Sequence, residues 1–76
     1  MPQDKPVNPI SKTIESAIDV MSRLLTQAAR DTLEAYEHMR NSEQNLAIGT
    51  IITIEDALDA VTALYKSVMH LHRIKR

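Results

Sequence analysis

Residues 10–39, ISKTIESAIDVMSRLLTQAARDTLEAYEHM, carry apolar side chains at alternating intervals of four and three residues. Neither Gly nor Pro interrupts the chain between residues 10 and 48. This spacing predicts an amphipathic α-helix with a broad apolar face, typical of a helix packed in a bundle rather than in a two-stranded coiled coil. The predicted stripe consists of Ile14, Ile18, Met21, Leu25, Ala28, Thr32, Ala35 and Met39, widened by Ile10, Ala17, Leu24, Ala29, Leu33 and Tyr36.

The start of this helix is marked by Asn8 and Pro9. Asn is a strong N-cap, and Pro is favoured at the first helical position. Upstream, Pro2 and Pro6 lie in a polar segment and restrict their neighbours away from helix. We therefore expect residues 1–8 to form a flexible arm and residues 9–76 to form a single helical domain.

A second helix is predicted from Thr53 to the C-terminal end. Asp56 lies three residues after Thr53, as in an acidic variant of the capping box. Gly49, the only glycine, fits the left-handed position that follows a helix end, so we expect residues 50–52 to form an extended linker. The stripe of this second helix is Ile54, Leu58, Val61, Tyr65, Val68 and Leu71 or His72, widened by Ala57 and Leu64.

Residues 41–45 are entirely polar and admit two interpretations. They are either the solvated last turns of the first helix or a break near Asn41. The apolar pattern resumes at Leu46, seven residues after Met39, and this interval favours one continuous helix that ends near Ile48.

The predicted helix lengths do not match. At 1.5 Å per residue the first helix would be roughly 58 Å long and the second roughly 31 Å, so the N-terminal half of the first would be uncovered. A chain this small also buries little core by itself. The sequence therefore predicts an all-α helical hairpin that dimerises into a four-helix bundle, against the alternative of a monomeric three-helix unit with a break near Asn41. The expected dimer core is Ile14, Ile18, Met21 and Leu25.

Composition excludes several classes of function. The chain has 76 residues, a net charge of −1, no Cys and one Gly. Disulfides, thiolate zinc sites, cysteine catalysis and a Gly-rich phosphate loop are excluded. The N-terminal segment is polar and Pro-rich, unlike a signal peptide, and the apolar runs are too short to span a membrane. Cytoplasmic localisation is the default expectation.

No pattern of residues predicts catalysis. Glu34 and His38 lie four residues apart on one helical face, but a third and fourth metal ligand have no place except from His70 or His72. We therefore interpret the pair as a solvated Glu–His contact. The carboxylates of Glu55, Asp56 and Asp59 suit the start of a helix better than an acid–base site. We expect a non-enzymatic protein without a cofactor or a metal.

The remaining candidates are surface residues. Tyr36, Tyr65, Met69 and Val20 are the apolar or amphipathic side chains least needed for the core, and Tyr is over-represented at interface hot spots. We expect them to bind an unidentified partner protein, so that the dimer works as an adaptor or as an inhibitor of the kind that phages and plasmids direct at host proteins.

An alternative function follows from the only basic patch in the sequence. Arg73, Lys75 and Arg76 close the chain, and a dimer would carry two such ends. They are possible phosphate contacts of a nucleic-acid-binding regulator. The patch is short and lacks interleaved aromatic residues, and its cations also suit the C-terminal end of a helix dipole. Nucleic acid is therefore the less favoured partner.

Overall fold

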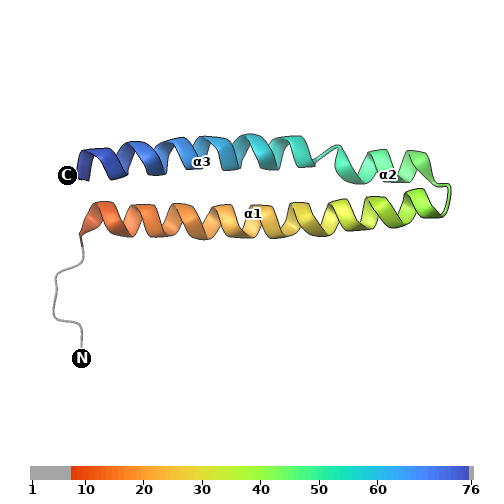
Figure 1. Ribbon diagram of the computed structural model, residues 1–76, viewed down its shortest axis with the longest axis horizontal. Helices are drawn as coiled ribbons and strands as arrows, with labels where there is room; N and C mark the ends of the chain where they lie inside the picture. Colours follow the sequence, from red (N-terminus) through yellow and green to blue (C-terminus); the bar gives the residue numbers. More distant parts are fainter. Residues whose placement is uncertain (1–7, 76) are drawn as a thin grey trace, which may run out of the picture.

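The chain folds as an all-helical hairpin (Figure 1). The computed structural model describes residues 8–75 and contains α1 (Pro9–Arg40), α2 (Gln44–Ile51) and α3 (Ile54–Lys75), with no strand in that range. After a tight turn, α2 and α3 run end to end along α1 in the opposite direction. α1 packs on both of them. The predicted all-α hairpin is confirmed.

The predicted start of α1 is also confirmed. Asn8 has an extended backbone (φ −71°, ψ 124°), and its side-chain Oδ1 accepts a hydrogen bond of 2.8 Å from the backbone N–H of Ile10. Pro9 occupies the first helical position, where its missing N–H costs no helical hydrogen bond. The rest of the predicted arm, residues 1–7, lies outside the described residues.

α1 ends at Arg40, so the prediction of a continuous helix to about Ile48 is wrong. The backbone N–H of Glu43 donates to the carbonyl of His38 at 2.8 Å, and that of Ser42 donates to the carbonyl of Met39 at 3.0 Å. These two bonds form a Schellman motif, which satisfies the last carbonyls of the helix. Ser42 takes the left-handed conformation (φ 61°) that the motif requires.

The predicted role of Gly49 is wrong as well. Gly49 lies inside α2 and has no positive φ, and the expected linker at residues 50–52 is mostly helical. The interruption between α2 and α3 falls instead at Ile52 and Thr53. The seven-residue interval from Met39 to Leu46 matches the spacing of a continuous helix. The chain reverses between these two residues, so this spacing did not indicate helical continuity.

Glycine is expected to have opposite effects on stability at residues 49 and 42. Gly49→Ala places a Cβ where no atom lies within 4 Å, and alanine is favoured over glycine inside a helix by about 1 kcal/mol. Ser42→Gly removes the steric cost of a left-handed L-residue, about 1 kcal/mol. We expect each change to raise the free energy of unfolding in urea denaturation. Ser42→Ala is the control, and a gain in stability for that variant would contradict the argument from φ.

The two arms of the hairpin are nearly equal in length. α1 has 32 residues, and it faces α2 with 8 and α3 with 22. The predicted overhang of the first helix therefore does not exist, and the expectation of a dimer loses that support. The argument from the small core remains.

The side chains between the arms recur at intervals of three and four residues. The buried ones among the described residues are Ala28, Ala35 and Ala47. We call the inward-facing side chains the seam. On α1 they are Ile10, Ile14, Ala17, Met21, Leu24, Ala28, Asp31, Ala35 and His38, and on the returning arm Ala47, Thr50, Ile54, Ala57, Val61, Leu64, Val68 and Leu71, flanked by the half-buried Ser11, Ala60 and Met69.

Candidate interaction surface

Two flat sides flank the seam, and helical geometry assigns residues to each. Antiparallel helices are related by a half-turn about an axis perpendicular to the plane that contains both. Equivalent positions on the two arms therefore lie on the same side of that plane. The inward-facing residues come in pairs three residues apart, such as Ile14 and Ala17. Each residue along a helix is rotated by about 100° from the one before it. The residue after the second member of a pair therefore points to one side, and the residue before the first member points to the other.

One side is apolar. On α1 it carries a row of exposed residues seven apart, and the returning arm carries an equivalent exposed row on the same side. We call this set the apolar face: Ile18, Leu25, Thr32, Met39, Ile51, Leu58, Tyr65 and, at the open end of the hairpin, His72. Farther from the seam on this side lie Ser22, Ala29, Tyr36, Ile48, Thr62 and Met69, and the charged residues among the described positions there are Glu15 and Glu55.

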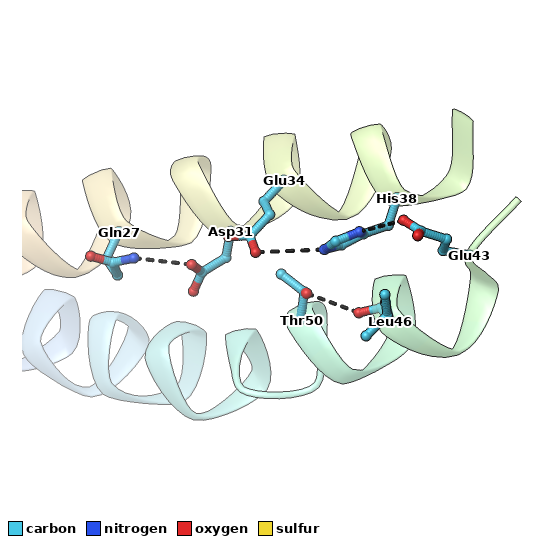
Figure 2. Close-up of polar contacts among 7 residues, drawn as sticks. All are labelled: Gln27, Asp31, Glu34, His38, Glu43, Leu46 and Thr50. Atoms are coloured by element: carbon cyan, nitrogen blue, oxygen red, sulfur yellow. Dashed lines mark hydrogen bonds and ion pairs between the residues drawn. The ribbon is translucent and has the colours of Figure 1, made fainter. Parts of the chain in front are cut away.

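The opposite side is polar, and we call it the polar flank: Thr13, Val20, Gln27, Glu34, Leu46, Thr53, Ala60 and Ser67. Thr13 and Ser67 line one shallow hollow together with Lys66, His70 and Leu71, as residues of one side should. Figure 2 shows polar contacts along α1 up to the turn, including the Gln27 amide, which donates a hydrogen bond of 3.0 Å to the Asp31 carboxylate. Arg23, Arg30 and Glu37 lie farther out on this side.

The structure divides the predicted dimer core. Ile14 and Met21 are half-buried in the seam, so they serve the packing of the hairpin itself. Ile18 and Leu25 are 51% and 45% exposed, and both belong to the apolar face. One edge of the predicted stripe thus packs against the other arm, and the other edge is exposed.

The predicted partner-binding residues do not form one cluster. Tyr65 lies in the apolar face and Tyr36 beside it, at 54% and 59% exposure. Met69 is half-buried on the same side. Val20 is exposed on the polar flank. Leu58 was not predicted as a surface residue because it continues the stripe of the returning arm, and Ile51 was not because it was expected to lie in the linker with its side chain in the core.

The predicted phosphate contacts are only partly described. Arg73 is exposed near the end of α3, and Lys75 is the last residue of that helix. Arg76 lies outside the described residues.

His38 organises the end of α1. Its ring Nδ1 lies 3.0 Å from Glu43 Oε1, across the turn, and its Nε2 lies 3.5 Å from Glu34 Oε2 (Figure 2). The Glu34–His38 contact was predicted, but as a solvated pair on the outer face, whereas His38 is half-buried in the seam. Glu43 was missed because the helix was expected to continue past it. Among residues 8–75 no group of three or more His, Asp or Glu side chains is placed to hold a metal ion.

These contacts predict a pH dependence of stability. The hydrogen bond to Glu43 raises the pKa of His38 above 6.5; partial desolvation opposes this effect, and Glu34 adds to it. Because the pKa of His38 is higher in the folded state, protonation of its ring stabilises the fold. This contribution is complete below the unfolded pKa of about 6.5 and is lost as the pH rises through the folded pKa.

We therefore expect wild type to lose stability relative to His38→Gln between about pH 6 and pH 8 in urea denaturation. His70→Gln, at an exposed position on the side opposite the apolar face and near the other end of the hairpin, is the matched control. A difference between wild type and His38→Gln that stays constant across this range would show that the ring contacts do not depend on protonation.

No protein-family model matches the chain, and neither a curated protein nor a solved structure shows significant similarity to it. Within the described part of the chain, the helices lack the combination of length and apolar character needed to cross a bilayer.

Proposed function

We propose that this chain is a non-enzymatic protein-binding protein that associates with itself and acts by occupying a surface on another protein, as an adaptor or an inhibitor. The observation that supports the proposal is the apolar face. A contiguous exposed apolar surface is uncommon on a monomer and is typical of interaction sites. A rigid helical face binds without catalytic groups.

Tyr36 is the best candidate for contact with a foreign protein. It is exposed at the edge of the apolar face, on the outer side of α1, and remains accessible when the face itself is covered. Tyr carries a large amphipathic ring at low entropic cost, which explains its frequency among hot spots.

The test is affinity capture of partners from source cells, followed by titration of the purified partner. Tyr36→Ala should weaken binding at least about tenfold, whereas Glu34→Gln, His38→Gln and Asp59→Asn should change it little. Circular dichroism and light scattering must first show that each variant keeps the helicity and mass of wild type. Loss of binding in the His and carboxylate variants alone, or capture that nuclease abolishes, would contradict the proposal.

A further inference from the structure

We propose that the occupant of the apolar face is a second copy of this chain, packed face to face into a four-helix bundle; this inference rests on the self-association in the proposed function and assigns its surface. The residues that carry it are Leu25, Leu58 and their neighbours in the two exposed rows.

The hairpin by itself is a single layer. It is only 11 Å thick along its shortest axis, and no buried side chain among the described residues is larger than Ala. Stable domains pack at least two layers of secondary structure around a core of large apolar side chains. A second layer must therefore come from outside the hairpin.

The apolar face is large enough for a stable dimer. The 32 residues of α1 span about 48 Å, and two helices side by side are about 20 Å across, so one flat side offers roughly 900 Å². Stable interfaces bury about 800 Å² on each partner. The polar flank offers a similar area, but its row carries the charged Glu34, which contact would desolvate.

The apolar face is also compatible with itself. An interface related by a two-fold axis places the same surface on both partners, so it must tolerate its own charges. Glu15 and Glu55 are exposed and lie away from the seam, where they remain solvated at the rim. The central rows of the face carry no charged residue between Ile18 and Met39 on α1, or between Ile51 and Tyr65 on the returning arm.

A second copy of the chain is favoured over a foreign protein because each folded chain needs additional buried apolar surface. The shortage of buried apolar surface affects the folding of every copy, because the buried residues of the seam are alanines and its larger apolar side chains are only half-buried. The occupant must be present wherever the chain folds. Another copy of the same chain meets that condition.

The first experiment measures mass by light scattering at low-micromolar concentration. Wild type should give twice 8.6 kDa. Leu25→Glu should shift the mass toward monomer or unfold the chain, and Val20→Glu should stay dimeric. The two sites are matched, since both lie in α1 and are 45% and 44% exposed, on opposite sides. A monomeric wild type, or equal masses for both variants, would overturn the inference.

The second experiment stays informative if Leu25→Glu fails to fold. The native chain has no Cys, so Leu25→Cys and Leu58→Cys variants are refolded singly and as a mixture and treated with a thiol cross-linker that spans about 10 Å, the distance between packed helix axes. Both sites lie near the middle of their arms. Cross-linked dimer from single variants indicates turns at opposite ends of the bundle, and product only in the mixture indicates turns at the same end.

Either pattern supports the apolar face as the interface. Cross-linking of Val20→Cys alone, or of no variant, assigns the contact elsewhere and overturns the inference. Partner binding is measured separately with Tyr36→Ala, which leaves the two central rows intact. A dimer that uses the apolar face but captures no protein would refute only the proposed function.

Discussion

Ile18→Asp is expected to unfold the protein at low-micromolar concentration, whereas Leu33→Asp is expected to cost only about 0.5–1 kcal/mol. In an isolated hairpin the two changes should cost about the same, because Ile18 and Leu33 are 51% and 63% exposed in the same helix. In the proposed bundle Ile18 lies in the interface, where an unpaired carboxylate costs several kcal/mol. Leu33 points away from both flat sides.

Circular dichroism during urea titration measures both variants against wild type. Raising the protein concentration should partly rescue Ile18→Asp, because association stabilises the folded chain by mass action. Equal stabilities for the two variants at every concentration would mean that the apolar face is solvated in the native protein.

The second large effect concerns the seam. Ala47 is 2% exposed where α2 meets α1, so Ala47→Leu must force the helices apart. Overpacking costs about 1–3 kcal/mol, which corresponds to a fall in the melting temperature of roughly 5–20 °C for a domain of this size. Ala63→Leu is the control, since Ala63 is exposed in α3.

Thermal denaturation followed by circular dichroism measures this effect. Leu and Ala have similar helix propensities, so the control isolates packing from helix formation. A fall of the same size in both variants would mean that the arms are not closely packed at α2.

Local chemistry was enough to predict the elements with strong signals. Asn8 and Pro9 define the start of α1, and the intervals of the apolar residues define two amphipathic arms. These features depend only on residues close in sequence, so propensity and periodicity capture them.

The turn could not be predicted in the same way. Ser42 occupies the left-handed position, for which Gly49 was the obvious candidate, and hydrogen bonds to His38 and Met39 offset the cost of a side chain there. The polar residues 41–45 are compatible with a solvated helix and with a turn. The choice between them depends on tertiary packing of α2 against α1.

The candidate surface was predicted only in part for a similar reason. A broad stripe identifies all the apolar residues of α1 but does not say which edge faces the other arm. The seam includes Asp31 and His38, whose polar groups have partners in Gln27, Glu34 and Glu43. Because the edge of the helix that includes Asp31 and His38 faces the other arm, Ile18 and Leu25 face outward.

The equal arms and the tight turn at residues 41–43 also set an order of folding. Ala35 and Ala47, at the turn end, are separated by 12 residues, whereas Ile10 and Leu71, at the open end, are separated by 61. Closing the longer loop first would cost roughly 1.4 kcal/mol more in chain entropy. We therefore expect the hairpin to close progressively from the turn toward its ends. In the proposed dimer the apolar face would be completed in the same direction, and we expect the step that depends on protein concentration to come last.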